Sequence, residues 1–224
     1  MRTYAIIPAG GKGVRSGNAT PKQYLKFSGK ELIVHTLEAF QKNKLVDEII
    51  LVVSPIYFSL IQKLKKKYKL TKLTGIVEGG KERQDSVFNG LNSISANNND
   101  LIIVHDAARP LLPQTVLTKA IKTAKNKGNA LVCLKARDTL INGNIIVKDY
   151  LDRNEIYNVQ TPQIFKYSDL MKAMNFAYKS KFYGTDESIL IRNIGKKINI
   201  VEGSPLNFKI TTKEDIQIFK KLAK

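Results

Sequence analysis

The sequence of 224 residues contains a single cysteine, Cys133, and only two histidines, His35 and His105. One cysteine cannot form an internal disulfide, so we expect the protein to work in a reducing compartment, the cytoplasm. So few cysteine and histidine side chains give no cluster with zinc-site spacing and no support for a Ser-His-Asp triad. Cys133 stands in an apolar run, and we interpret it as a small core residue rather than a catalytic thiol.

Long apolar runs are missing as well, because no stretch reaches the roughly 18 apolar residues of a membrane-spanning helix. No charged leader precedes an extended apolar region either, so we expect neither membrane insertion nor export. The sequence has no internal repeat, low-complexity tract or linker. We therefore expect residues 1–224 to form one domain.

Acidic residues are scarce: 19 Asp and Glu stand against 37 Lys and Arg, which gives a formal net charge of +18. Such a field attracts anionic ligands and can bind nucleic acid non-specifically. The lysines, however, are scattered rather than interleaved with aromatic residues, and the one dense run, 63–67, is typical of a solvated helix face. We expect a small anionic partner and no nucleic acid.

Short apolar runs alternate with stretches of helical period along most of the chain, which predicts a doubly wound α/β fold with a mostly parallel, Rossmann-like sheet flanked by helices. Gly128 is expected just past the end of one helix, and Thr211 with Glu214 to form a capping box at the start of the last. The predicted strands are 4–7, 48–53, 73–78, 101–104, 130–134, 159–165, 199–202 and 208–210. The predicted helices are 31–42, 56–68, 85–94, 115–127, 167–179, one opened by 185–187 that stops near 195, and one that ends at 222.

An Asn142-Gly143 pair between two β-rich runs predicts a tight hairpin within residues 138–147. We interpret the region of about 137–158 as a β-arm that protrudes from the domain. Apolar residues on such an arm are usually covered by a partner.

The first predicted strand runs into a segment with four glycines between residues 10 and 17 and two cations, Arg15 and Lys22. Glycine backbone amides and neighbouring cations suit a phosphate group. The segment fits neither the Walker loop nor the dinucleotide fingerprint, in which glycine would replace Ser16. Gly79–Gly80 and Asp106–Arg109 also follow predicted strands, so all three segments should meet at the carboxyl edge of the sheet. Cations and backbone amides there suit phosphoryl transfer, which depends on positioning and charge stabilisation.

The motifs then resemble a known family. Pro8-Ala-Gly-Gly-Lys-Gly-Val-Arg15 with Pro21-Lys-Gln-Tyr24 is similar to the signature of sugar- and polyol-phosphate nucleotidyltransferases. The further motifs, in order and with similar spacing, resemble the 2-C-methyl-D-erythritol 4-phosphate cytidylyltransferase family; they are Gly79-Gly-Lys-Glu-Arg-Gln-Asp-Ser-Val87, Val104-His-Asp-Ala-Ala-Arg-Pro110, Asp138-Thr139, Gln160-Thr-Pro-Gln163, Thr185-Asp-Glu187 and Asn207-Phe-Lys-Ile-Thr-Thr212.

This resemblance implies a nucleotidyltransferase fold and transfer of CMP from CTP to the polyol phosphate with Mg²⁺, in non-mevalonate isoprenoid synthesis. Arg15 and Lys22 would stabilise the transition state, and Arg153 and Lys209 would position the incoming phosphate. Asp106 is the expected metal ligand. The CTP-binding residues would be Ala9, Gly10, Gly11, Gly80 and Ser86, and the polyol site would be lined by Asp106, Arg109, Thr139, Thr161 and Thr185.

The resemblance also implies a homodimer in which the arm lends Thr139 and Arg153 to the neighbouring active site. Two other interpretations stay open from the sequence. One is a ribitol 5-phosphate cytidylyltransferase on the same scaffold, and the other is a basic protein that binds nucleotide or nucleic acid without turnover. Purely structural roles are also open for three residues. Arg109 could brace its loop, Asp106 could cap the next segment, and Arg83 is interpreted as structural.

Overall fold

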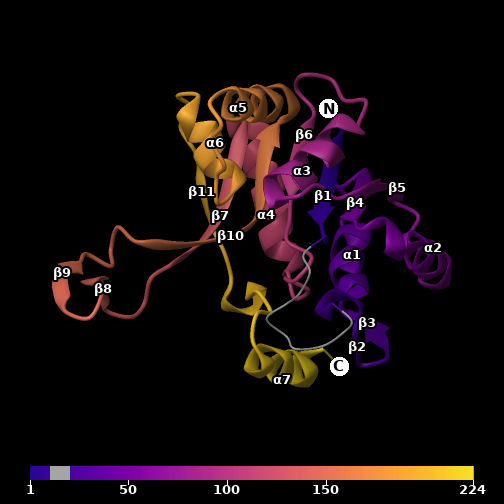
Figure 1. Ribbon diagram of the computed structural model, residues 1–224, viewed down its shortest axis with the longest axis horizontal. Helices are drawn as coiled ribbons and strands as arrows, with labels where there is room; N and C mark the ends of the chain where they lie inside the picture. The colour runs from indigo at the N-terminus through magenta and orange to yellow at the C-terminus, as the bar shows by residue number, and fades with distance from the viewer. Residues whose placement is uncertain (11–20, 224) are drawn as a thin grey trace.

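The computed structural model describes residues 1–10 and 21–223. Its centre is a seven-stranded sheet (Figure 1). The inner strands of this sheet are rich in buried isoleucine, valine and leucine. Only β10 runs antiparallel to its neighbours. The strand order is β11 (Ile200–Glu202), β7 (Asn129–Lys135), β10 (Tyr157–Lys166), β6 (Leu101–Val104), β1 (Thr3–Pro8), β4 (Glu48–Val53) and β5 (Leu73–Glu78).

Helices cover both faces of this sheet, which explains why its central strands are apolar on both sides. Along β1, Ala5 and Ile7 face one core, whereas Tyr4 and Ile6 face the other. The first core is closed by α1 (Leu32–Lys42), α2 (Phe58–Lys67) and α4 (Gln114–Lys127). The second is closed by α3 (Arg83–Asn92), α5 (Tyr167–Lys179) and α6 (Glu187–Asn193). The predicted mostly parallel, doubly wound sheet is confirmed.

Cys133 lies in β7 with 2% of its surface exposed, and burial raises the pKa of its thiol to about 11. The thiol is therefore neutral and packs as a small apolar group, as expected. Gly128 ends α4 in the left-handed region, with φ of 85°, which confirms its expected place past the helix. Within the described residues, no helix has both the length and the apolar character needed to cross a bilayer.

A third, small core lies apart from the sheet, around α7 (Lys213–Leu222). Phe219 of α7 packs against the ring of Phe27. Leu32 and Ile210 belong to the same core, which joins the last helix to the segment around Phe27. Phe27 belongs to a short ribbon of β2 (Lys26–Phe27) and β3 (Lys30–Glu31). This core holds the two chain regions that carry Lys22 and Lys209 against each other.

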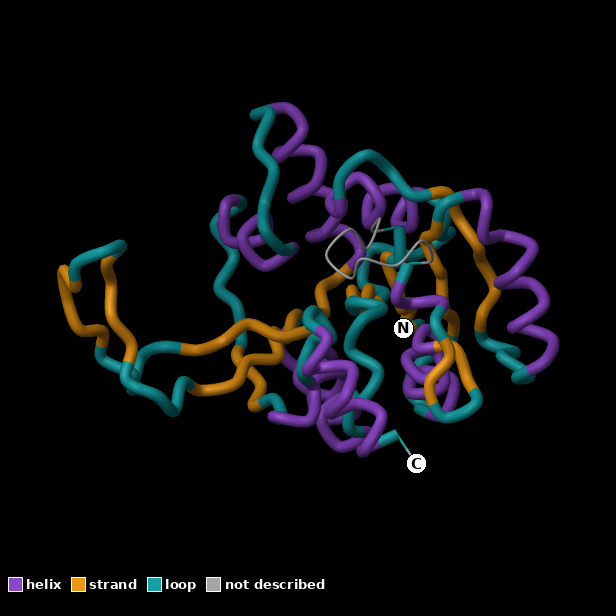
Figure 2. Tube along the Cα trace, turned by 60° about the horizontal axis from the view of Figure 1, so that its bottom comes forward, coloured by secondary structure: helices purple, strands orange, loops and turns teal. Residues whose placement is uncertain are grey.

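The predicted hairpin is present as β8 (Leu140–Gly143) and β9 (Val147–Leu151), and it projects from the body of the molecule (Figures 1 and 2). The place of its turn was predicted wrongly. Asn142 and Gly143 belong to β8, and residues 144–146 form the turn. The glycine is needed beside the turn instead, because a Cβ on Gly143 would lie 2.5 Å from the Ile146 carbonyl oxygen.

Two further details differ from the predictions. Residues 208–210 are not a strand, because the Ile210 amide donates a hydrogen bond to the Ala108 carbonyl, in a loop rather than in the sheet. The capping box of α7 is formed by Thr212 and Asp215, one residue later than expected. Since residues 211–215 offer both registers, only the geometry of the helix start selects between them.

Candidate active site

Two glycine-bearing loops meet at the carboxyl edge of the sheet. The Ala9 amide, just past β1, donates to the Val52 carbonyl, and the Gly79 amide, just past β5, donates to the Val53 carbonyl. Both loops are therefore fixed to the end of β4. A Cβ on Gly10 would lie 4.0 Å from the Gly79 Cα, so the two loops touch at these glycines. The predicted meeting of these loops is confirmed.

Ser86, in the first turn of α3, holds the second loop in place. Its hydroxyl accepts a hydrogen bond from the Gly80 amide at 3.0 Å and donates to the Glu82 carbonyl at 3.1 Å. Gly80 itself is exposed beside the start of the helix. Backbone amides at such a helix start favour negative groups. The structure thus places Ala9, Gly10, Gly80 and Ser86 together, whereas Gly11 and Arg15 lie outside the described residues.

Lys22 begins a short 3-10 turn that the neighbouring residues anchor firmly. The buried side-chain amide of Gln23 donates from Nε2 to the Ala9 carbonyl at 2.8 Å, and Tyr24 stacks on Tyr57 with ring centroids 3.9 Å apart. The Lys22 ammonium donates to the Ile210 carbonyl. Lys22 is therefore joined both to the first loop and to the segment that carries Lys209.

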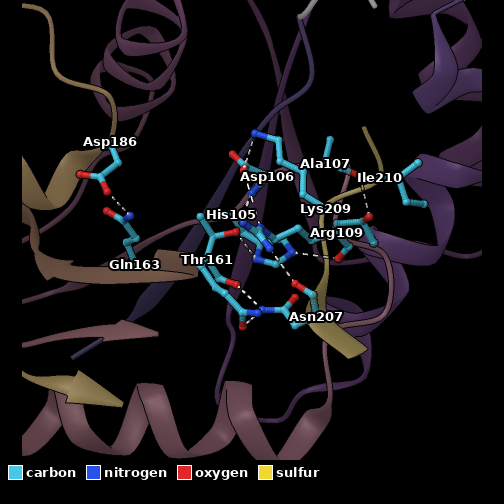
Figure 3. Close-up of polar contacts among 12 residues, drawn as sticks. His105, Asp106, Ala107, Arg109, Thr161, Gln163, Asp186, Asn207, Lys209 and Ile210 are labelled. Atoms are coloured by element: carbon cyan, nitrogen blue, oxygen red, sulfur yellow. Dashed lines mark hydrogen bonds and ion pairs between the residues drawn. The ribbon is translucent and has the colours of Figure 1, made fainter. Parts of the chain in front are cut away.

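Asp106, just past β6, is the centre of a charge cluster (Figure 3). Its carboxylate lies 2.9 Å from the Lys209 ammonium, 3.3 Å from Arg83 Nε and 3.8 Å from Arg109 Nε. Burial alone would raise the pKa of Asp106, but these three cations outweigh it and hold the pKa well below its usual range. Asp106 is therefore ionised, and the three cations around it outnumber its single negative charge.

Arg83 also binds a second, buried carboxylate. Its two terminal nitrogens donate to Glu187 at 2.6 and 3.0 Å, while the Glu187 side chain is 1% exposed. Burial raises the pKa of Glu187, and Arg83 counteracts this effect. Since Arg83 opens α3 and Glu187 opens α6, the pair joins the second glycine loop to the helix that follows Thr185. A cavity of about 390 Å³ beside the pair has a wall that includes Arg83 and Tyr183.

His105 and Thr161 fix the backbone that carries Asp106. His105 Nε2 lies 3.1 Å from the Arg109 carbonyl, which only accepts, so this nitrogen carries the proton. The Thr161 hydroxyl then donates to His105 Nδ1 at 3.0 Å and accepts from the Asp106 amide at 3.1 Å. Thr161 is 4% exposed and acts on Asp106 through this loop, which sequence reasoning did not foresee.

Burial of His105 lowers its pKa from 6.5 to about 4, so the stability of the protein should depend on pH. Between pH 6.5 and 4 the unfolded chain binds a proton that the folded protein does not, and unfolding therefore becomes easier as pH falls. The loss should be on the order of 3 kcal/mol once pH 4 is reached. Urea unfolding at pH 7 and pH 5 should show roughly 2 kcal/mol of this loss. His105→Gln should remove this component, and an unchanged pH difference in that variant would contradict the assignment.

The remaining predicted residues lie around this cluster or far from it. Thr185 is exposed and precedes Asp186, which caps α6 and accepts a hydrogen bond from Gln163 at 3.1 Å (Figure 3). Thr139 and Arg153 are exposed and flank the β8–β9 hairpin, and within the described residues neither forms a hydrogen bond or ion pair with the Asp106 cluster. Arg153 donates to the Arg137 carbonyl at 3.3 Å.

Loops with exposed glycines and a lysine–arginine cluster thus share the carboxyl edge of a mostly parallel sheet. This arrangement can hold a triphosphate and a second anion together, and it defines a nucleotidyltransferase. Residues 3–222 match the family model described as 2-C-methyl-D-erythritol 4-phosphate cytidylyltransferase. The chain belongs to this family and is a cytidylyltransferase.

Individual relatives agree with this assignment. The chain is 39% identical over 220 residues to the enzyme of that name from Syntrophus aciditrophicus, covering 96% of this chain and 93% of the relative. The 4-diphosphocytidyl-2C-methyl-D-erythritol synthase structure from Anaerococcus prevotii superposes with a TM-score of 0.85 at 28% identity, covering 99% and 98% of the two chains. The Francisella tularensis 2-C-methyl-D-erythritol 4-phosphate cytidylyltransferase structure gives 0.81 at 32% identity, covering 97% and 98%.

Proposed function

We propose that the protein transfers CMP from CTP to 2-C-methyl-D-erythritol 4-phosphate, giving the CDP-alcohol and pyrophosphate. The observation that carries this proposal is the cluster of Arg83, Arg109 and Lys209 around Asp106, beside two glycine-bearing loops, in a chain of this family. A phosphate oxygen of the alcohol substrate attacks the α-phosphorus of CTP. The bond from that phosphorus to the β-phosphate oxygen breaks, and pyrophosphate leaves.

Both substrates are polyanions, so their approach is opposed until cations neutralise them. We assign the triphosphate to the loops of Ala9, Gly10 and Gly80, with Ser86 supporting Gly80 and with Gly11 contributing by its motif. Lys22 and Arg15 would stabilise the negative charge that develops around the α-phosphorus. The hydrogen bond from the Lys22 ammonium to the Ile210 carbonyl supports this role, because it places Lys22 next to the segment that carries Lys209.

The alcohol end of the site is proposed to lie at the Asp106 cluster. Lys209 would position the incoming phosphate, and Asp106 with Arg109 would bind the alcohol. Thr185 completes this side in the proposal, and the buried Thr161 supports it through His105 and the Asp106 amide. Support comes from the Arg83–Glu187 pair, which fixes the helix after Thr185 to the same cluster.

We propose Mg²⁺ as the cofactor, where it would neutralise charge on the triphosphate. Among the described residues no group of three or more His, Cys, Asp or Glu side chains could hold a metal ion. Mg²⁺ binds only one or two carboxylates together with substrate phosphates and water, so the triphosphate would supply most of its ligands. Asp106 is the carboxylate that this proposal assigns to it.

We further propose a cytoplasmic homodimer whose arms complete each other's sites. The arm exposes apolar side chains that water disfavours, with Ile145 and Ile146 96% and 78% exposed. Thr139 and Arg153 are exposed in the segments that flank this projecting hairpin, where a second subunit could contact them. A neighbouring subunit that covers the arm would receive both residues.

A coupled pyrophosphate-release assay tests the proposed reaction. CTP, ATP, GTP and UTP are each supplied with 2-C-methyl-D-erythritol 4-phosphate or with ribitol 5-phosphate, with and without Mg²⁺. We expect release from CTP with the methylerythritol substrate and Mg²⁺. Faster pyrophosphate release with ribitol 5-phosphate would show that ribitol 5-phosphate is the alcohol substrate instead. No release from any pair would show that the protein does not catalyse this reaction.

Arg153→Ala should weaken the use of the alcohol substrate. The variant should raise KM for the polyol phosphate by roughly tenfold or more, because a charge-assisted contact to a phosphate is lost. KM for CTP should stay unchanged. Lys148→Ala removes an exposed cation elsewhere on the arm and serves as the matched control. Unchanged KM and kcat for the alcohol in Arg153→Ala would reject the role of the arm.

A further inference from the structure

We propose that Asn207 is the positioning residue for Lys209, an inference that rests on the role proposed above for Lys209. Residues 204–210 form a segment, called here the C-terminal strap, that crosses from β11 to α7 (Figure 1). Lys209 reaches Asp106 from this strap, although no helix or strand of the sheet supports its backbone. The position of its ammonium therefore depends on how the strap is attached.

Asn207 supplies the polar attachment, and its side chain is completely buried (Figure 3). Its side-chain nitrogen donates to the Thr161 carbonyl at 2.7 Å and to Gln160 Oε1 at 3.1 Å. Gln160 in turn donates to the Ser204 carbonyl at 3.0 Å. The strap is therefore pinned to β10 at the point where Thr161 supports Asp106.

The backbone around Asn207 is tied to the loop after β6. The Asn207 carbonyl accepts from Arg109 at 2.7 Å, and the Ile210 amide donates to the Ala108 carbonyl at 2.8 Å. Ile210 is also completely buried, so Lys209 stands between two anchored neighbours. Both residues of the Lys209–Asp106 contact are therefore held by β10. Asp106 is held through Thr161, and Lys209 is held through Asn207.

A residue that only stabilises the fold would have a different effect from one that positions Lys209. Loss of stability lowers the amount of folded protein but leaves the kinetics of the folded fraction unchanged. A displaced Lys209 lowers kcat/KM in the folded enzyme, because a shift of about 1 Å in a catalytic group can cost 10²-fold in rate. The displacement has no further effect once the Lys209 ammonium has been removed.

The test is a double-mutant cycle of Asn207→Ala and Lys209→Ala, measured on folded protein by pyrophosphate release. Asn207→Ala should lower kcat/KM for the polyol phosphate by roughly 10- to 100-fold, with KM for CTP unchanged. In the Lys209→Ala background the same substitution should cost less than about twofold, because interacting positions are not additive. Gln160→Ala removes one of the two acceptors of Asn207 and should give an intermediate loss if Asn207→Ala does not fold.

Asn43→Ala is the matched control. Asn43 is 4% exposed, and its side-chain nitrogen donates to Gln114 and to Thr118, each at 3.0 Å, but it precedes β4 at the opposite edge of the sheet. Its removal should lower the unfolding temperature and leave kcat/KM unchanged. Multiplicative losses in the cycle, or wild-type kinetics in both Asn207→Ala and Gln160→Ala, would overturn the positioning role. Wild-type kinetics in Lys209→Ala would instead reject the proposed role of Lys209.

Discussion

Lys22→Ala is expected to lower kcat by roughly 10²-fold or more, because removal of one well-placed donor to a charged transition state costs about 3 kcal/mol. The proposed reaction develops negative charge around the α-phosphorus, and water cannot supply a fixed ammonium there. The measurement is steady-state pyrophosphate release at saturating CTP and polyol phosphate. Saturation matters because it separates a loss of transition-state stabilisation from a loss of binding.

The fold should survive this substitution. The turn that begins at Lys22 is held by Gln23, which is bonded to Ala9, and by Tyr24, which stacks on Tyr57. Neither contact involves the lysine side chain, and the Ile210 segment that loses the Lys22 hydrogen bond is still held by the Ile210 amide on Ala108. Thermal unfolding of Lys22→Ala is therefore expected to remain cooperative, with a midpoint close to that of the wild type.

Lys26→Ala is the control for charge. Lys26 lies four residues after Lys22, at the start of β2, and its side chain is 65% exposed, with Glu31 at 3.9 Å as its ionic partner. Glu31 is buried, but it keeps its hydrogen bond from the Tyr68 hydroxyl at 3.3 Å, and the exposed ammonium makes only a long contact, so loss of Lys26 should cost little stability. The control removes the same charge from the +18 total and should keep wild-type kcat. Near wild-type kcat in a folded Lys22→Ala variant would show that Lys22 does not stabilise the transition state.

The sheet and its helices could be predicted from the sequence because their signals are local. Runs such as 49–53 and 101–104 are apolar at every position, and the structure shows them within β4 and as β6, between helices on both faces. The strand that follows the arm was also predicted. Its antiparallel direction could not be, since direction depends on where the arm returns the chain.

Errors arose where a residue pattern fits two geometries. Asn-Gly commonly forms a hairpin turn, but here the turn follows it and Gly143 provides room for the Ile146 carbonyl. Residues 208–210 alternate like a strand, yet their hydrogen bonds go to the loop after β6. In both cases the outcome depends on contacts that are distant in sequence or on backbone closure.

The candidate site divides in the same way. Glycine loops after strands could be placed at one sheet edge from topology alone. By contrast, Arg83 and Glu187 are separated by 104 residues, and no spacing rule joins them. The same holds for Asn207 and Thr161. Their importance follows from burial combined with charge or hydrogen bonding, which only the folded chain reveals.

Arg83→Met is expected to destabilise the protein by about 3 kcal/mol, because it leaves the Glu187 carboxylate buried without a counter-charge. The lower part of the usual range applies, since the Arg83 side chain is 31% exposed whereas Glu187 is 1% exposed. Methionine keeps most of the aliphatic packing of arginine, so the loss reports mainly on charge. Urea unfolding measures the free energy.

Two comparisons isolate the buried carboxylate as the cause. The double variant Arg83→Met/Glu187→Met should recover most of the stability, because removal of both charges leaves no unpaired ion. The deficit of Arg83→Met should also be smaller at pH 5 than at pH 8. Burial already raises the pKa of Glu187 in the wild type, and without Arg83 the folded variant takes up a proton more readily than the unfolded chain. Lys81→Met, two residues earlier and exposed, should change stability by no more than about 0.5 kcal/mol. A deficit that is independent of pH and persists in the double variant would show that Arg83 stabilises the fold by packing rather than by neutralising Glu187.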